Sequence, residues 1–425
     1  MLLKNRARFL SLYFSSIGWK QSLHIFSSIL ILPFINKDKS RSQFHSSFSK
    51  KFKKHSCYSY SSGRASLAAC LKASGIEKGD EVLLSSFTCL AVPTAVVALG
   101  AVPKYCDIDP VTLNIDPNLI KQHISNKTRA IVVQHTLGSI ACVNSIKDLL
   151  ADRDILIIED CALSLGSAQN QRLIGTSADA TIFSLELSKT ISSGWGGVLL
   201  VNNEELEEKV RNDYKNTKEI RLSKSLRMAF QTAFCGILYS PNVYFLGKFV
   251  VALFFKLRLF GASTPECELE GSVESDFISK LPKVLLPLAR EQIERFDEIT
   301  SNHKVNSIRI IKKLHELNYS VLGEYLEDNY SVSPRVPFLV KERKVFVDFF
   351  MARGIEVGSW FDGPLSPLPE KQNFNYIAAN YPKASFVACH IVNLPCHARL
   401  KSNDLVLIED TLEDFSKKFL DQVIF

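Results

Sequence analysis

The sequence predicts an α/β fold: a large domain with a mainly parallel sheet, followed by a smaller C-terminal α+β domain. The chain has 425 residues, more than one small core usually organises. From about residue 61, short apolar runs alternate with helical stretches, which is typical of parallel sheets crossed over by helices. Several runs are apolar throughout rather than alternating, as strands covered on both faces require.

The large domain is predicted over residues 61–225. Its expected strands are residues 81–87, 102–108, 130–135, 155–160, 179–185 and 197–202. Helical stretches lie between several of them, at residues 66–74, 144–152 and 204–216. In such a fold, ligand-binding groups gather at the carboxyl ends of the strands.

Residues 1–60 are predicted to be a basic N-terminal arm with an amphipathic segment. They hold eleven Lys or Arg against the single acid Asp38, a balance of +10 in a chain whose formal charge is +7. A basic segment attached to an otherwise near-neutral chain suggests binding to phospholipid headgroups more than to nucleic acid. The alternative is an arm that is simply solvated. The apolar stretch 23–35 is too short to span a bilayer and lacks a clear cleavage site, so we expect an uncleaved surface segment.

Residues 226–265 are predicted to be an apolar insertion. Between Met228 and Phe255 the only charge is Lys248, and Pro241 interrupts the stretch, so two short helices joined by a turn are expected. Flanking cations suggest contact with a membrane surface. A buried helical pair or a subunit contact is the alternative. Residues 266–425 then form the smaller domain.

The ten cysteines show no repeated CxxC or Cys/His spacing. Many of them lie in apolar runs, which favours reduced thiols in the cytoplasm over a zinc site or a disulfide framework. We therefore predict a cytoplasmic protein, peripheral at the inner face of the membrane, with no metal site.

Three places at predicted strand ends carry polar residues suited to chemistry. Gly63 and its hydroxyl-bearing neighbours precede a helix, where free N–H groups and the helix dipole suit a phosphate, although an ordinary helix cap has the same composition. Asp160 ends a buried strand and needs a cation, such as a protonated pyridine nitrogen, to stay charged; a helix cap or a structural ion pair is the alternative. Lys189 follows a strand and precedes a glycine-rich turn, where partial desolvation keeps an amine reactive; a solvated surface charge is the alternative.

The order of these three sites resembles the fold-type-I PLP-dependent enzymes, specifically the DegT/DnrJ/EryC1/StrS sugar aminotransferases. The resemblance runs from about Phe48 to the C-terminus, with residues 226–270 as a divergent part. The supporting stretches lie at residues 79–82, 99–103, 107–110, 112–116, 158–162 and 393–395.

The resemblance implies pyridoxal 5′-phosphate (PLP) as cofactor and assigns roles to individual residues. Lys189 would bind the cofactor covalently and carry protons, and Asp160 would keep its pyridine nitrogen protonated. His135 matches a histidine usual in the family near a strand end and is predicted to be catalytic. The phosphate would be held by the side chain of Ser184 and by the chain around Gly63, Arg64 and Ala65.

Three departures from the family pattern affect the predicted site. Leu163 stands where a glutamine usually contacts the cofactor's hydroxyl group. Cys89 stands where an aromatic usually stacks on the pyridine ring, and Phe87 is a possible substitute. Arg64 replaces the usual threonine after the glycine of the phosphate loop and adds charge there.

The resemblance implies transfer of an amino group from an amino acid, glutamate, to a nucleotide-linked keto-sugar in surface polysaccharide or glycan biosynthesis. It also implies a homodimer, because sites in the family are completed across a subunit interface. One rival is a PLP-dependent sugar dehydratase, in which a histidine replaces the lysine. The other is a non-catalytic, membrane-attached regulator or scaffold of the same fold.

Overall fold

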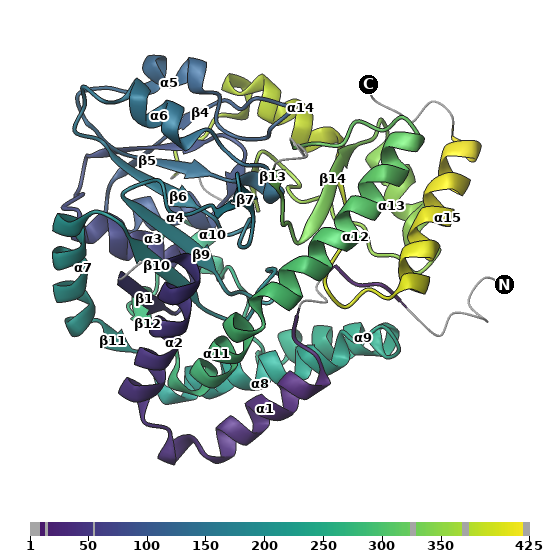
Figure 1. The fold of residues 1–425 in the computed structure, drawn as a ribbon, viewed down its shortest axis with the longest axis horizontal. Helices are drawn as coiled ribbons and strands as arrows, with labels where there is room; N and C mark the ends of the chain where they lie inside the picture. The colour runs from purple at the N-terminus through teal and green to yellow at the C-terminus, as the bar shows by residue number, and fades with distance from the viewer. Residues whose placement is uncertain (1–8, 13–15, 54–55, 324–328, 368–373, 420–425) are drawn as a thin grey trace.

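The computed structural model describes residues 9–12, 16–53, 56–323, 329–367 and 374–419 and has the predicted α/β architecture (Figure 1). Its centre is a nine-stranded sheet in the order β11-β12-β1-β10-β9-β6-β5-β2-β4. In this sheet β4, β2, β5, β6 and β9 are parallel, whereas β10 and β1 run antiparallel to their neighbours. The strands are β1 (Ser56–Tyr60), β2 (Glu81–Ser85), β4 (Val102–Cys106), β5 (Thr128–Gln134), β6 (Leu156–Asp160), β9 (Ala180–Ser184), β10 (Gly197–Val201), β11 (Lys218–Glu219) and β12 (Ser279–Lys280).

Both faces of the sheet are covered, which explains why runs such as 155–158 are apolar without alternation. In β5, Val132 packs into one core while Ile131 and Val133 pack into another. Two sets of helices form these two cores with the sheet. The first set is α3 (Gly63–Ala73), α4 (Ala91–Val97) and α7 (Glu204–Asn216), and the second is α5 (Pro117–His123) and α6 (Val143–Leu149).

The six predicted strands are confirmed, and most of their ends agree with the prediction to within one or two residues. Strand β1 was not predicted. It pairs with β10, so residues predicted to belong to the N-terminal arm contribute to the large sheet. Two more helices precede it, α1 (Trp19–Leu30) and α2 (Lys37–Phe52). The α2 residues Phe48 and Phe52 are buried, and Phe48 packs on Phe183 of β9 with ring centroids 5.3 Å apart. Four of the eleven cations counted in residues 1–60 lie outside the described residues: Lys4, Arg6, Arg8 and Lys54.

The apolar insertion forms two helices joined by a turn, as predicted. They are α8 (Leu222–Leu238) and α9 (Tyr244–Lys256), and α8 packs along α1 (Figure 1). Within the described residues, none of the helices combines the length and the hydropathy needed to cross a bilayer. A short helix, α10 (Glu266–Leu269), follows.

The smaller domain packs helices on a two-stranded antiparallel sheet of β14 (Arg335–Leu339) and β16 (Ile391–Pro395). Two consecutive helices, α11 and α12, meet at Arg295. The helices from there on are α11 (Leu286–Glu294), α12 (Phe296–Glu316), α13 (Arg343–Met351), α14 (Pro382–His390) and α15 (Ser402–Lys418). The remaining strands are two residues long. β3 (Thr88–Cys89) pairs with β15 (Leu365–Ser366), and β7 (Ala168–Gln169) pairs with both β8 (Arg172–Leu173) and β13 (Asn329–Tyr330).

Candidate active site

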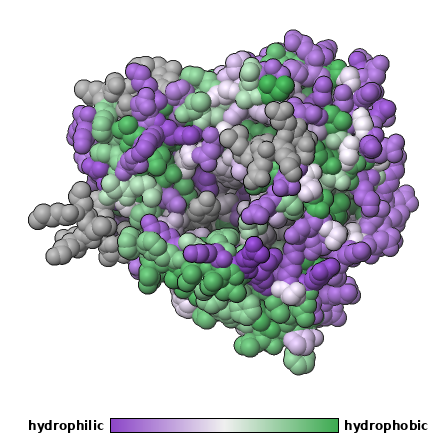
Figure 2. Space-filling model, turned by 180° about the vertical axis from the view of Figure 1, so that it is seen from behind, coloured by the Kyte–Doolittle hydropathy of each residue, from purple (hydrophilic) through white to green (hydrophobic). Residues whose placement is uncertain are grey.

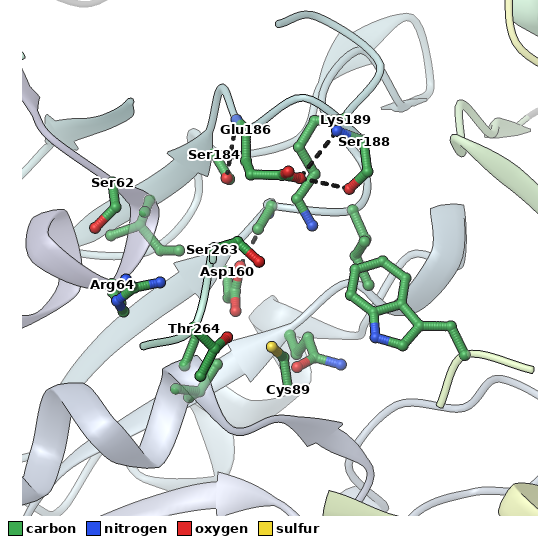
Figure 3. Close-up of a pocket in the computed structure, with 18 of the residues that line it drawn as sticks. Ser62, Arg64, Cys89, Asp160, Ser184, Glu186, Ser188, Lys189, Ser263 and Thr264 are labelled. Carbon is green, nitrogen blue, oxygen red and sulfur yellow. Dashed lines mark hydrogen bonds between the residues drawn. The ribbon is translucent and has the colours of Figure 1, made fainter. Parts of the chain in front are cut away.

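A cavity of about 330 Å³ lies where β5, β6 and β9 end, beside the start of α3 (Figure 3). The strand register brings Gln134 of β5 beside Asp160 of β6, and Asp160 beside Ile182 of β9. Because parallel strands end at the same sheet edge, segments far apart in sequence meet here. Five of the predicted site residues line this cavity: Gly63, Arg64, Asp160, Ser184 and Lys189.

The start of α3 forms one end of the cavity. Ser62 caps the helix, since its Oγ accepts a hydrogen bond of 3.2 Å from the backbone N–H of Ala65. A Cβ atom on Gly63 would lie only 3.1 Å from the Cβ of Ser184, so glycine allows the helix start to approach β9 closely. The Ser184 hydroxyl and the positive end of the helix dipole therefore face the same space, which suits a phosphate. Ala65 itself is buried outside the cavity lining.

Arg64 is paired with an acid that the sequence did not suggest. Its Nε lies 2.9 Å from Oε1 of Glu268, which belongs to α10. Burial raises the pKa of Glu268 to about 7, outweighing the attraction of Arg64. The contact is not aligned as a hydrogen bond: Nε of Arg64 and Oε2 of Glu268 have no hydrogen-bond partner among the described residues. The Nε–H of Arg64 is therefore left to donate to an anion at this end of the cavity.

The pKa of Glu268 predicts a pH-dependent competition for Arg64. Below pH 7 the carboxyl group is neutral and Arg64 offers its full charge to a phosphate; above pH 7 the carboxylate offsets that charge. We expect wild type and Glu268→Gln to bind PLP equally at pH 6. At pH 8 the variant should bind about fivefold more tightly, equivalent to about 1 kcal/mol.

Dissociation constants from equilibrium dialysis at the two pH values check this prediction. Taking the ratio between the two proteins at each pH cancels the ionisation of the phosphate and of other site groups. Glu266→Gln, which changes an exposed acid on the same helix, is the matched control and should follow wild type. Equal affinities of wild type and Glu268→Gln at pH 8 would contradict the proposed competition.

Asp160 lies on the floor of the cavity at the end of β6 and is 4% exposed. Its Oδ1 accepts a hydrogen bond of 2.9 Å from the N–H of Ala162, which fixes the orientation of the carboxyl group. Burial raises the pKa of Asp160, while Ala162 and Lys189 act in the opposite direction. A cation bound above this carboxylate would compensate its burial, as the sequence predicted.

Lys189 reaches the cavity from the turn after β9. Its backbone N–H donates to the carbonyl of Glu186 at 3.0 Å, and its Nζ lies 4.6 Å from the ring centroid of Trp360. Burial is the main cause of a lowered pKa, although the nearby Glu186 carboxylate raises it. A lowered pKa increases the neutral fraction of the amine, the form that attacks a carbonyl group.

The glycine-rich turn after Lys189 is held by the apolar insertion. Gly194 has a φ of +81°, and a Cβ atom there would lie 2.0 Å from Oγ1 of Thr232 in α8. Glycine is therefore needed both for the backbone conformation and for the approach of α8. The helix pair α8–α9 is thus part of the support of the lysine turn.

His135, predicted to be catalytic, does not line the cavity. Its Nε2 lies 3.0 Å from Oε2 of Glu159, and its Nδ1 accepts a hydrogen bond of 3.0 Å from the N–H of Ala141. Its backbone N–H donates to the carbonyl oxygen of Asp160 at 3.0 Å. In this geometry His135 supports the strand end that carries Asp160, and any role in proton transfer stays a prediction.

The cavity also contains residues that sequence reasoning missed. Gln134, Glu186, Arg335 and Trp360 line it, as do two residues of the insertion, Ser263 and Thr264. Among these residues, Arg335 was the one that the sequence could have suggested, because it is a charged residue at the start of the apolar run 335–340. The family departures Leu163 and Cys89 both line the cavity, whereas Phe87 is fully buried and packs on Phe361, with ring centroids 4.9 Å apart.

Solved structures share this fold. The structure of DesI in the presence of its TDP-sugar product matches with a TM-score of 0.72 at 18% identity, covering 97% of this chain and 95% of DesI. The sugar aminotransferase CalS13 from Micromonospora echinospora matches with a TM-score of 0.72 at 20% identity, covering 95% of this chain and 99% of CalS13. These matches confirm the predicted fold type I of PLP-dependent transferases.

Sequence comparison gives the same assignment. The spore coat polysaccharide biosynthesis protein SpsC of Bacillus subtilis is 24% identical over 98% of this chain and 99% of its own length. GDP-perosamine synthase of Vibrio cholerae is 32% identical over 39% of this chain and 46% of its own length. The sequence profile of the DegT/DnrJ/EryC1/StrS aminotransferases matches residues 31–413. This chain, a PLP-dependent aminotransferase, therefore belongs to the DegT/DnrJ/EryC1/StrS aminotransferase family.

Proposed function

We propose that this enzyme uses PLP to transfer the amino group of glutamate to a nucleotide-linked keto-sugar, in the biosynthesis of a surface polysaccharide or glycan. One observation carries the proposal: Lys189, Asp160 and the phosphate-type end at Gly63 line the same cavity. The sugar substrate is supported by the relatives, since DesI was solved with a TDP-sugar product and SpsC is named for polysaccharide biosynthesis.

The residues of the cavity fit the cofactor. Ser184, Gly63 and Arg64 would hold the phosphate at the start of α3, and Asp160 would pair with the ring nitrogen. When bound, PLP supplies an aldehyde that reacts with amines and a ring that accepts electrons. The hydrophobic side chain of Leu163 and the thiol of Cys89 would complete the wall around the ring.

Lys189 has two tasks in this proposal. Its Nζ would hold the cofactor covalently, and the same amine would accept and return protons within the cavity. Burial lowers the pKa of Lys189 and so increases the neutral fraction of the amine, which both tasks need. Glu186, whose carboxylate accepts hydrogen bonds from Ser188, lies beside the lysine and limits the fall in its pKa.

Asp160 has a single task, to remain ionised against the ring nitrogen. Its hydrogen bond from Ala162 and the buried His135–Glu159 pair beneath it keep its position fixed. Because a carboxylate in this place is costly without a cation, the site favours the protonated ring over the neutral ring.

Arg335 is the residue we assign to the carboxylate of the amino donor. It is 4% exposed, lines the cavity, and its guanidinium carbon lies 4.7 Å from the ring centroid of Trp360, the same ring that faces Lys189. A guanidinium group held against an aromatic ring can bind a carboxylate through paired hydrogen bonds. The donor's carboxylate would therefore bind near Lys189, where the donor's amine has to react.

Replacing Arg335 with glutamine should raise the KM for glutamate by roughly 10- to 100-fold, because a hydrogen bond to a charged group contributes about 1.5–3 kcal/mol. The KM for the sugar acceptor should change little. Steady-state kinetics with each substrate varied in turn measures the split. Arg290→Gln, at a surface arginine paired with Glu294 outside the cavity, is the matched control. An unchanged KM for glutamate with a raised KM for the sugar would assign Arg335 to the acceptor instead.

Nitrogen transfer tests the proposed reaction. The PLP-loaded protein is incubated with ¹⁵N-glutamate and a TDP-linked keto-sugar, and mass spectrometry measures ¹⁵N in the sugar product. The proposal expects label in an amino-sugar and formation of 2-oxoglutarate in equal amount. Bound cofactor without nitrogen transfer to any keto-sugar would favour the non-catalytic regulator, whereas loss of a sugar hydroxyl without nitrogen transfer would favour the dehydratase.

We also propose a homodimer located in the cytoplasm. The resemblance to the family supports the dimer, and the cysteine pattern supports the reducing compartment, since several thiols, among them Cys70, Cys161 and Cys396, are fully buried and free. Light scattering coupled to gel filtration measures the mass of the particle. A mass corresponding to one chain across the micromolar range would contradict the dimer.

A further inference from the structure

Helix α1 carries apolar side chains on its outer side as well as toward the protein, where Ile25 is fully buried. Its Ser22 and Ser28 are buried, and their hydroxyls donate to carbonyl oxygens of the preceding turn. Trp19, Leu23 and Leu30 are 60%, 56% and 80% exposed. A surface helix normally turns its apolar stripe toward the protein, so this arrangement indicates that the outer side has an apolar partner.

Helix α9 presents a second apolar surface beside it. Exposed residues follow one another around this helix: Phe245, Leu246, Phe249 and Leu253 are each at least half exposed. The helix is nonetheless fixed to the protein. A Cβ atom on Gly247 would lie 2.1 Å from a backbone oxygen of α8, and the Tyr244 hydroxyl donates to Glu356 of the smaller domain at 3.0 Å.

The two helices belong to one continuous area, which we call the apolar face. Figure 2 shows it as a broad hydrophobic region along the lower part of the molecule, unlike the mostly hydrophilic surface above and to the right. Phe26 of α1 packs edge-on against Phe234 of α8, which joins α1 to the α8–α9 pair. The exposed residues of the face are Trp19, Leu23, Leu30, Ile31, Phe34, Phe230, Ile237, Val243, Phe245, Leu246, Phe249, Leu253, Phe255, Leu257 and Leu259.

The charges of the apolar face have a single sign. Residues 16–36 and 220–265, which form it, contain seven Lys or Arg and no Asp or Glu. Lys248 lies over the rings of Phe245 and Phe249, at 5.3 and 5.4 Å from their centroids, and Lys256 and Arg258 are exposed at the end of α9. Cations on long apolar stems at the edge of an apolar area match a bilayer, whose interior is apolar and whose headgroups are anionic.

We infer that the apolar face binds the surface of an anionic phospholipid bilayer, with α1 and α9 lying in the plane of the headgroups. Insertion to about 5–10 Å would bury the exposed Leu and Phe side chains and leave the cations at phosphate level. A second copy of the chain fits less well. If two apolar faces packed on each other, their cations would come close together, and the face has no acid to neutralise them. This inference does not depend on the proposed reaction.

Vesicle flotation with the full-length, PLP-loaded protein tests the inference. Vesicles contain phosphatidylcholine and phosphatidylglycerol in equal parts, or phosphatidylcholine alone. The protein should float with the anionic vesicles at low salt, and its partition coefficient should fall roughly tenfold or more with neutral vesicles or at high salt. Trp19 gives a second readout: its emission should shift to the blue and be quenched by brominated lipid. Trp19→Phe should remove that change, because Trp195 and Trp360 line the cavity.

Two variants separate the apolar and the charged contributions. Leu246→Asp combined with Phe249→Asp should abolish flotation, and Lys248→Glu, Lys256→Glu and Arg258→Glu together should reduce binding to anionic vesicles to the level seen with neutral ones. Val305→Asp with Ile308→Asp, two exposed apolar residues on α12, is the matched control and should float like wild type. Circular dichroism verifies that each variant folds.

Three outcomes would overturn the inference. The wild-type protein could fail to float with anionic vesicles, or Leu246→Asp with Phe249→Asp could float as well as wild type. The third is that these apolar substitutions convert a dimer into a monomer while wild type does not float, which would assign the face to a second copy of the chain.

Discussion

Replacement of Lys189 with alanine should abolish amino transfer, with a fall in kcat/KM of roughly 10⁴-fold or more, because the same amine attaches the cofactor and moves the proton. Arginine at this position should fail equally, since it keeps the positive charge but cannot form the covalent bond. The variant should still bind PLP, at lower affinity, because the phosphate end of the cavity is intact. Absorbance spectroscopy should then show free rather than lysine-bound cofactor.

The control for this experiment is Lys209→Ala, which removes an exposed lysine paired with Glu205 on α7. It should leave both the spectrum and the kinetics unchanged. A Lys189→Ala protein that retained the spectrum of lysine-bound PLP, or more than a small fraction of wild-type turnover, would contradict the role assigned to this residue.

Replacement of Asp160 with asparagine should slow amino transfer by roughly 10³-fold while leaving PLP bound, because an uncharged group no longer keeps the ring protonated. Asparagine preserves the size of the side chain and can still accept the hydrogen bond from Ala162, so the loss reports on charge rather than on shape. Kinetics measures the first effect and equilibrium dialysis of PLP the second.

Asp160→Glu gives a further test of charge against position. It restores the negative charge at the wrong distance and should recover part of the lost rate. Asp152→Asn, at an exposed site beyond α6, is the neutral control. Near-normal turnover in Asp160→Asn would mean that the carboxylate has only a structural role at the end of β6.

The sequence predicted the sheet well because each strand carries its own local signal. Runs such as 155–158 are apolar without alternation, because the strand is buried on both faces. The polar residues that follow such a run could therefore be placed at the sheet edge. Asp160 and Ser184 follow directly, since each is the last residue of its strand. β1 was missed because its residues, 56–60, mix Ser with Cys and Tyr and follow a segment dominated by charge.

The residues that complete the cavity depend on contacts that no local pattern encodes. Arg335 and Trp360 lie in the smaller domain, far beyond Lys189 in the sequence, and reach the cavity only through the packing of that domain on the large sheet. The partner of Arg64 could not be predicted either, because Glu268 comes from the divergent part of the chain. His135 follows the end of its strand, as the family pattern predicted, but its ring contacts Glu159 and does not line the cavity, so its catalytic role stays a prediction.

Reductive labelling tests the central claim most directly. The protein is loaded with PLP, treated with borohydride to make the bond between cofactor and lysine permanent, digested, and mapped by mass spectrometry. The cavity geometry predicts one labelled peptide, with the pyridoxyl mass on Lys189, and no label on the exposed lysines Lys209 or Lys256. Label on a different lysine, or no label on a protein that is folded and saturated with PLP, would contradict the assignment of Lys189 and with it the proposed reaction.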